Sequence, residues 1–357
     1  MTNPHYWPSM TDYQEALQAP SLAFSSTELR SGAAVENNLG LPRPICGTFA
    51  SVYELVNGRR RWAIKCFLRN TPDLHERYAK ISNHLRKCQR LGYFVRFEYQ
   101  QKAIRVRGEL FPIVKMEWIE ACQLNKFVED NLSSPRVLAK FGKRWDKLVA
   151  NLRSANIAHG DLQHGNILVQ SNGAIRLIDY DGMWVPALEG YKSNETGHPD
   201  FQNPHRTRND YNLGIDEFSA AVIGIAVLAL RRDKSLWEKY NNGDNLLFRR
   251  RDFLDPHSSQ LITDLREIAD NEIDEKLNFL IKACTGTKRA SSHNRRDKAV
   301  ARKQGLTKAA STTIVKSGSW LSDHVEDYGG QSKNREIRLP PRSPAGIRER
   351  LIEWLRP

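Results

Sequence analysis

The sequence predicts an α+β fold, in which a small β-rich region with one helix precedes a mostly helical region that carries one more hairpin. Three observations favour this order. Two Asn-Gly turns lie between β-rich runs, an apolar stripe recurs at helical spacing near the middle of the chain, and a later segment is apolar on nearly every side. The 357 residues and 40% hydrophobic content are enough for real hydrophobic cores.

Two hairpins are predicted from turn chemistry. Residues 51–56 and 61–67 flank Asn57-Gly58, and residues 166–169 and 174–179 lie around Asn172-Gly173. Asn-Gly between β-rich runs is the strongest short-range hairpin signal, because both residues accept positive φ angles.

Three helices are predicted from the spacing of apolar residues. The stripe of Leu138, Phe141, Trp145, Leu148 and Leu152 predicts an amphipathic helix. Residues 216–230 are apolar nearly all round, which indicates a helix buried in the centre of a domain. A shorter helix is expected at about residues 73–89, after the first hairpin.

Composition divides the chain into three parts. Residues 1–39 are polar with short apolar islands, and we expect them to pack as an extension onto a domain of residues 40–285. Residues 286–357 carry 16 Lys and Arg against 7 Asp and Glu, so this tail holds +9 of the formal charge of +13. The first part of this tail, residues 287–316, has no aromatic residue and is too polar to form an ordered core. A short C-terminal helix is predicted around Ile347, Leu351 and Trp354.

Charge and hydropathy limit the partners. The body of the chain is nearly balanced in charge, so nucleic acid could bind only through the basic tail. We expect this tail to be a solvated linker, and contact with nucleic acid or an acidic partner is the alternative. The longest apolar run, residues 220–230, has 11 residues, whereas a membrane span needs about 20. A cytoplasmic protein without membrane contact is expected. The five cysteines are scattered without a C-x-x-C pair, which predicts free thiols.

The second hairpin brings two oxygen-bearing side chains together. If Asn172 and Gly173 form a two-residue loop, Asn166 lies opposite Asp179. An amide oxygen beside a carboxylate suits Mg²⁺, which prefers oxygen ligands. Asp161, five residues before Asn166, is then placed to accept a proton from an attacking hydroxyl.

The first hairpin places a lysine on an apolar face. A two-residue Asn57-Gly58 loop would pair Val52 with Ala63, and Lys65 shares the strand face of Ala63 because side chains alternate along a strand. A lysine in this position could meet phosphates, and the apolar pair could cover a flat base.

The motifs together resemble the protein kinase superfamily. Residues 159–166, His-Gly-Asp-Leu-Gln-His-Gly-Asn, resemble the catalytic loop H-R-D-x-x-x-x-N; Ala63-Ile64-Lys65 resembles V-A-I-K, and Asp179-Tyr180-Asp181 stands at D-F-G. The H-G-D loop and the D-Y-D-G continuation look like a bacterial branch of kinase-like proteins. The resemblance implies a bilobal fold, with a β-rich lobe at residues 40–118 and a helical lobe at residues 119–285.

The resemblance also implies roles for individual residues. Asp161 would be the catalytic base, Lys65 the ligand of the α and β phosphates, and Glu76 the ion-pair partner of Lys65, although Glu76 could also be an exposed helix charge. Asn166 and Asp179 would hold Mg²⁺. The implied ATP contacts are Gly47, Phe49, Val52, Ala63, Lys65, Met116 at the gatekeeper position, the backbone of Glu117, Trp118 and Ile119, and Leu168.

Three functions stay open at this point. The resemblance implies transfer of the γ-phosphate of ATP, with a protein Ser or Thr as the leading acceptor. Gly160, Gln163 and His198 replace an arginine, a lysine and a threonine of Ser/Thr kinases, so a small-molecule kinase of the aminoglycoside or choline kinase type is the second candidate. A nucleotide-binding pseudokinase scaffold is the third candidate. The presence of all four polar residues expected at the core of the active site argues against it, namely Lys65, Asp161, Asn166 and Asp179.

Overall fold

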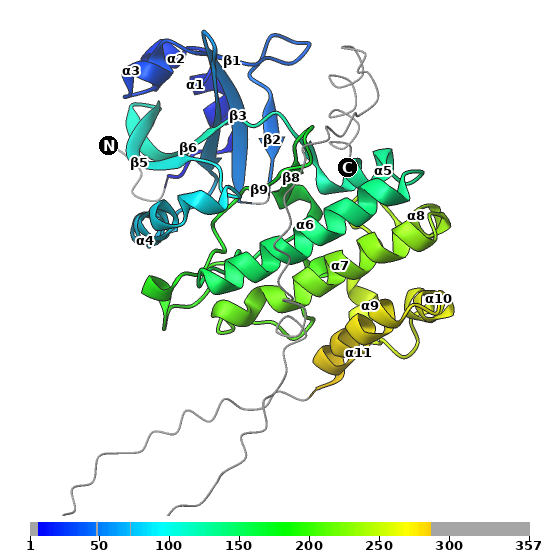
Figure 1. Ribbon diagram of the computed structural model, residues 1–357. Helices are drawn as coiled ribbons and strands as arrows, with labels where there is room; N and C mark the ends of the chain where they lie inside the picture. Colours follow the sequence, from blue (N-terminus) through cyan, green and yellow to red (C-terminus); the bar gives the residue numbers. More distant parts are fainter. Residues whose placement is uncertain (1–5, 48, 72, 287–357) are drawn as a thin grey trace, which may run out of the picture.

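The computed structural model describes residues 6–47, 49–71 and 73–286, and these form two lobes. In Figure 1 the upper lobe is built around an antiparallel sheet and the lower lobe is mostly helical, so the predicted α+β architecture is confirmed. The upper lobe contains α1 (Met10–Ala16), α2 (Pro20–Ala23), α3 (Thr27–Arg30), β1 (Ala33–Ala34), β2 (Pro44–Cys46), β3 (Ala50–Asn57), β4 (Arg60–Phe67), α4 (Leu74–Lys87), η1 (Gln89–Leu91), β5 (Phe97–Val106) and β6 (Glu109–Glu117). The lower lobe contains β7 (Cys122–Gln123), α5 (Leu124–Asp130), α6 (Pro135–Ser154), η2 (His164–Asn166), β8 (Ile167–Val169), β9 (Ile175–Leu177), η3 (Pro186–Leu188), η4 (Pro199–Phe201), η5 (Leu213–Asp216), α7 (Glu217–Arg232), α8 (Ser235–Tyr240), α9 (Arg250–Leu254), α10 (Gln260–Glu267) and α11 (Asn271–Thr285).

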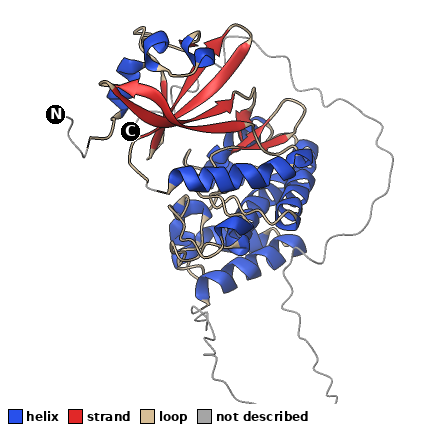
Figure 2. Ribbon diagram, turned by 90° about the vertical axis from the view of Figure 1, so that its left-hand side faces the viewer, coloured by secondary structure: helices blue, strands red, loops and turns tan. Residues whose placement is uncertain are grey.

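The sheet of the upper lobe has the order β1-β3-β4-β6-β5, and β2 pairs with another part of β3. The N-terminal segment is part of this lobe, because β1 joins the sheet and the short helices pack on it (Figure 2). Five buried hydrophobic residues of this segment form one cluster with buried residues of β3, β4, β5 and β6: Tyr13, Leu17, Ala23, Phe24 and Leu29. A capping box between Ser9 and Asp12 starts α1.

The first predicted hairpin forms with a different register. Val52 lies opposite Lys65 instead of Ala63, because Gly58 and Arg59 form the two-residue loop. Gly58 has a φ of 58°, which suits a turn with glycine in the first central position. The register differs by two residues, so each side chain keeps its predicted face of the sheet and Lys65 remains beside Ala63.

The second predicted hairpin, β8–β9, also differs in register. Its loop has three residues, 171–173, and Gly173 at its end has a φ of 76°, a common arrangement for three-residue hairpins. Asn166 therefore lies opposite Ile178, whose N–H donates to the carbonyl oxygen of Asn166 at 3.1 Å. Asp179 is the next residue, so the predicted pair is displaced by one position.

The helical lobe is organised around α6 and α7. The five residues of the predicted α6 stripe are all buried, and the indole of Trp145 donates to the carbonyl oxygen of Ala220 in α7 at 3.1 Å. The continuous helical stretch Leu213–Arg232, which joins η5 and α7, is long and apolar enough to cross a membrane. However, 78% of its most apolar 18-residue segment is buried inside the protein. It is the core helix predicted from residues 216–230.

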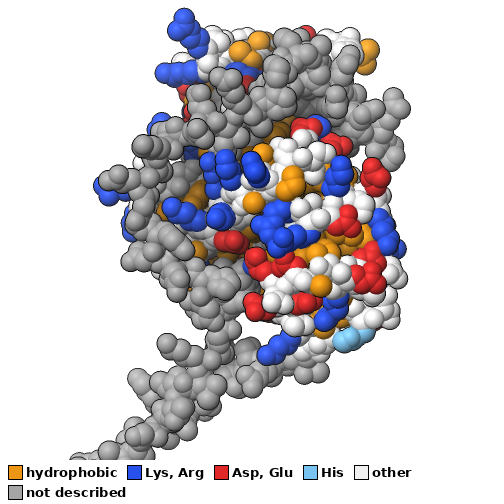
Figure 3. Space-filling model, turned by 45° about the vertical axis from the view of Figure 1, so that its right-hand side comes forward, with side chains coloured by type: hydrophobic (Ala, Val, Ile, Leu, Met, Phe, Trp, Pro, Cys, Tyr) orange, Lys and Arg blue, Asp and Glu red, His pale blue; other side chains and the backbone are white. Residues whose placement is uncertain are grey.

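Charged side chains of both signs are interspersed on the face of the protein in Figure 3. This mixture agrees with the nearly balanced charge of the chain before its basic tail. The tail and its predicted C-terminal helix lie outside the described residues.

Candidate active site

Lys65 on β4 lies between two carboxylates. Its Nζ is 2.6 Å from Oδ1 of Asp179 and 2.8 Å from Oδ2 of Asp181. Burial opposes the charged form of the amine, but the two carboxylates outweigh it and raise the pKa of Lys65 above its usual value. Lys65 is therefore an ammonium ion held at the junction of the lobes.

An apolar face of the sheet extends from Lys65. Val52 lies opposite Lys65, and Ala63 lies opposite Met116. Opposed residues of antiparallel strands point to the same face, and Ala63 and Lys65 are two residues apart on β4. All four side chains are half-buried. The structure thus brings together the lysine and the apolar residues that were predicted to cover a base.

Two of the expected ATP contacts, Gly47 and Phe49, lie in the connection between β2 and β3. Gly47 is exposed, and its N–H donates to the carbonyl oxygen of Ala50 at 2.9 Å. The guanidinium of Arg69 lies 3.4 Å from the centre of the Phe49 ring and covers it. From the lower lobe, Leu168 on β8 is half-buried.

The connection between the lobes already uses two of its backbone donors. The N–H of Glu117 donates to Arg96 and the N–H of Trp118 donates to Arg61, both to carbonyl oxygens at 3.0 Å. The donor that this stretch can offer to a base is therefore the N–H of Ile119.

Glu76 does not form the predicted ion pair with Lys65. Its Oε1 lies 2.8 Å from Nζ of Lys80 and accepts a hydrogen bond from the hydroxyl of Tyr191, and the side chain is 54% exposed. The reason lies in the orientation of α4. Tyr78, two residues later, points toward Asp181, and residues two apart on a helix point in nearly opposite directions.

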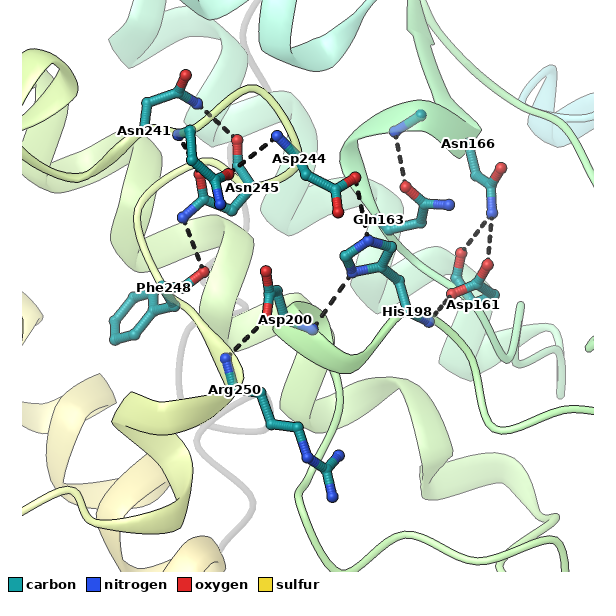
Figure 4. Close-up of polar contacts among 12 residues, drawn as sticks. Asp161, Gln163, Asn166, His198, Asp200, Asn241, Asp244, Asn245, Phe248 and Arg250 are labelled. Carbon is teal, nitrogen blue, oxygen red and sulfur yellow. Dashed lines mark hydrogen bonds and ion pairs between the residues drawn. The ribbon is translucent and has the colours of Figure 1, made fainter. Parts of the chain in front are cut away.

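Asp161 and Asn166, both predicted as site residues, contact each other at the catalytic loop. Nδ2 of Asn166 donates to both the carbonyl oxygen and Oδ2 of Asp161, each at 2.9 Å. The N–H of His198 donates to Oδ1 of Asp161 at 2.8 Å. Figure 4 shows Asp161 between these two residues, with the amide oxygen of Asn166 pointing away from it.

The surroundings of Asp161 shift its pKa in both directions. Burial raises its pKa above the usual range, the His198 N–H partly opposes this, and the negative charge of Asp179 adds to it. A carboxylate with a raised pKa is a better proton acceptor than an ordinary surface aspartate.

Asp179 has the opposite tendency. Desolvation also works against its ionised form, even though the side chain is 41% exposed, but Lys65 holds the pKa of Asp179 below its usual range. Its backbone φ of 65° is in the left-handed region, which is unusual for a residue other than glycine and often marks a functional site. Its carboxylate and the amide oxygen of Asn166 are the type of ligands that suit Mg²⁺.

A buried aspartate at the start of α7 fixes the catalytic loop. Asp216 accepts hydrogen bonds from the N–H groups of His159 and Gly160, the latter at 2.8 Å. The imidazole Nε2 of His159 lies 2.9 Å from the carbonyl oxygen of Ile178. His159 therefore joins the loop to the second hairpin.

The catalytic loop contacts residues 182–198 directly through backbone atoms. A β-carbon on Gly160 would collide with the carbonyl oxygen of Gly182, and Gly160 also has a φ of 82°. Only glycine fits both conditions. This explains why the sequence has Gly160 at the position of the arginine in the kinase pattern.

Three residues near the site were not assigned roles from the sequence. Two of them are Asp181 and Tyr78: Asp181 contacts Lys65 and also accepts a hydrogen bond from the hydroxyl of Tyr78. Glu195 lies near the carboxylates of Asp179 and Asp161, and burial together with these negative charges raises the pKa of Glu195 to about 8. Asp181 is the last residue of the recognised Asp179-Tyr180-Asp181 motif, whereas no sequence pattern marks Glu195.

Beyond Asp161 lies a group of residues from several elements (Figure 4). His198 Nε2 is 3.3 Å from Oδ1 of Asp244, in the turn after α8. Asn245 holds this turn by donating to three backbone carbonyls. His164 is fully buried next to His198 and Phe201, and burial lowers the pKa of His164 to about 4. His164 is thus neutral at physiological pH.

The comparison with protein families agrees with this geometry. The family model described as the protein kinase domain matches residues 46–295, more than half of the chain. The chain belongs to the protein kinase family, whose fold and site define a class of ATP-dependent phosphotransferases. The comparison with curated proteins found no match.

Proposed function

We propose that this protein is an active kinase that transfers the γ-phosphate of ATP to a Ser or Thr hydroxyl of another protein. The observation that carries the proposal is the convergence of Lys65, Asp161, Asn166 and Asp179 at the junction of the lobes. These residues come from a strand of one lobe and three positions of the other. A scaffold that only binds nucleotide would not need Asp161.

The nucleotide would lie between the lobes. Val52, Ala63 and Met116 would cover one face of the base, and Leu168 the other. The carbonyl of Glu117 and the N–H of Ile119 would contact its edge. Lys65 would bind the α and β phosphates as a point charge.

Asn166 and Asp179 would hold Mg²⁺. When bound, the metal ion would neutralise phosphate charge during transfer. The donor set fits this ion, because both side chains offer oxygen and Asp179 favours its ionised form.

Asp161 would orient the acceptor hydroxyl and accept its proton. Its raised pKa and its fixed position, between Asn166 and His198, suit this role. Correct placement of the hydroxyl for in-line attack would supply most of the rate enhancement.

The test uses the purified full-length protein with Mg²⁺ and ATP labelled on the γ-phosphate. We expect ADP release, label on the protein itself and label on proteins of a dephosphorylated cell lysate, recovered as phosphoserine or phosphothreonine. Label found only in small molecules of the lysate would support the small-molecule alternative. Nucleotide binding without ADP release or labelled product would indicate a pseudokinase.

A further inference from the structure

Asp181 is the more enclosed of the two carboxylates that bind Lys65. Its side chain is 15% exposed, compared with 41% for Asp179. Both of its oxygens are used by the protein: Oδ2 lies 2.8 Å from Nζ of Lys65, and Oδ1 accepts a hydrogen bond from the hydroxyl of Tyr78 on α4. Asp181 therefore connects β4 to α4.

Asp179 and Asp181 differ in what else they can do. In the proposed function Asp179 contributes to the metal site, and oxygen atoms that coordinate a cation bind an ammonium ion less well because the two positive charges repel. Asp181 has no such second task. It is the carboxylate that can stay with Lys65 whether or not a metal ion is bound.

The orientation of α4 excludes Glu76 from this role. Tyr78 is 2% exposed and its ring contacts Phe67, Phe97 and Tyr99, with the Tyr99 ring stacked at 5.4 Å. Turning α4 so that Glu76 faces Lys65 would remove Tyr78 from this aromatic cluster and from Asp181, because the two residues lie about 200° apart around the helix.

We propose that Asp181, held by Tyr78, is the positioning residue of Lys65, and that it takes the place which the family resemblance gives to Glu76. The proposal rests on the proposed function for the identity of the ligand of Lys65. It also assigns a purpose to the second aspartate of the Asp179-Tyr180-Asp181 sequence, which holds the ammonium group toward the phosphates through one oxygen and α4 through the other.

The first experiment measures ATP binding by calorimetry, with and without Mg²⁺. The full-length variants are Asp181→Asn, Tyr78→Phe, Lys65→Met and the double variant Lys65→Met/Asp181→Asn, with Glu76→Gln as the matched control on α4. Loss of a hydrogen bond to a charged group should weaken ATP affinity about 10-fold to 100-fold in Asp181→Asn, and somewhat less in Tyr78→Phe. Glu76→Gln should bind ATP as the wild type does.

The double variant separates positioning from a general structural role. If Asp181 acts through Lys65, Lys65→Met/Asp181→Asn should bind ATP no worse than Lys65→Met alone. Additive losses would overturn the proposal, and so would a loss in Glu76→Gln that is absent in Asp181→Asn. Tyr78→Phe keeps the test decisive if Asp181→Asn does not fold.

A second experiment needs no nucleotide. In thermal unfolding of the free protein, the loss of melting temperature caused by Asp181→Asn should shrink when Lys65 is already Met, whereas Glu76→Gln should show no such coupling to Lys65. If the wild type binds no ATP but this coupling is present, the proposed function fails and the pairing of Asp181 with Lys65 stands. If the coupling belongs to Glu76, the pairing is wrong.

Discussion

The carboxylates of the site occupy one small region, yet their proton affinities differ. Lys65 keeps the pKa of Asp179 low, whereas burial and neighbouring negative charges raise the pKa of Asp161 and Glu195. Residues whose environments separate their pKa values in this way can divide the work of metal binding and proton transfer. Substitutions at these positions should therefore have distinct effects.

Asp161→Asn and Asp179→Asn should give contrasting results. Asp161→Asn removes the charge that accepts the hydroxyl proton, so transfer should fall by about 10² to 10⁴ while ATP binding persists. Asp179→Asn removes a carboxylate from the metal site, so it should also reduce the gain in ATP affinity on adding Mg²⁺. Single-turnover transfer and calorimetry measure the two effects. Unaltered turnover in Asp161→Asn would contradict its role as the base.

Glu195 should make stability depend on pH. Its pKa is about 8 in the folded protein and has an ordinary value of 4.5, so between these values the folded state holds a proton that the unfolded state has lost. The contribution of Glu195 to stability is thus present below pH 4.5 and is lost as pH rises through about 8.

Glu195→Gln, which imitates the protonated acid, tests this dependence. The melting temperature of the variant relative to the wild type should increase steadily from pH 5 to pH 8, because the wild type loses stability and the amide does not titrate. The measurement is made with chelator present, since a bound cation would favour the ionised carboxylate. A constant difference between the two proteins would show that Glu195 has an ordinary pKa.

At the scale of elements, hairpins were predicted better than their registers. The Asn-Gly turns identified both hairpins, but the turn residues alone did not determine which positions form the loop. The β3–β4 loop keeps two residues and is displaced by one position, whereas the β8–β9 loop has three residues. The two-residue shift of β3–β4 left Lys65 on its predicted face. The one-residue shift of β8–β9 changed the pairing, so the exact neighbour of Asn166 could not be predicted.

A side chain at position 160 should disturb the packing of residues 182–198 against the catalytic loop. In Gly160→Ala the new β-carbon meets the carbonyl oxygen of Gly182, which moves the two backbones apart and should reduce turnover at least about 10-fold, since small displacements at an active site are costly. Gly190→Ala is the matched control, because Gly190 has the same φ of 82° and no atom within 4 Å of the added carbon. It should lose about 1 kcal/mol of stability and retain activity. Equal effects in both would show that φ alone matters.

The same contact predicts that activity does not depend on phosphorylation of residues 182–204. Gly160 offers no side chain to bind a phosphate, and backbone packing and the His198–Asp161 hydrogen bond already fix this segment. Phosphatase treatment should leave the rate of transfer nearly unchanged. A large decrease would point to Arg206, which donates to the carbonyl oxygen of Gly160 and has two buried nitrogens without a partner among the described residues.

At the scale of the whole molecule, the sequence predicted more of the site than of what surrounds it. Lys65, Asp161, Asn166 and Asp179 lie in local motifs with recognisable intervals. The position of Glu195 depends on the path of residues 182–198, which long-range contacts determine, and the outward direction of Glu76 depends on the aromatic cluster around Tyr78. Local patterns do not contain such information.

Removal of the tail after Gly286 should preserve folding and ATP binding. Helix α11 ends at Thr285 with its buried residues packed in the lower lobe, so the core that the described residues form includes no residue after this helix. The melting temperature and ATP affinity of residues 1–286 should match those of the full chain. An insoluble fragment, or loss of ATP binding, would mean that the tail docks on the two lobes.

The hydrogen bonds that Asp216 accepts from the catalytic loop have a consequence for synthesis on the ribosome. The upper lobe is formed entirely by residues up to Glu117, so it can fold while the rest of the chain is still being translated. The loop around Asp161 can be fixed only after Asp216 has been synthesised, more than 50 positions later. At about 5–20 residues per second this takes roughly 3 to 11 seconds. During this interval the nascent chain would have the strands of the upper lobe but no ordered Asp161, so the proposed phosphate transfer could not yet take place.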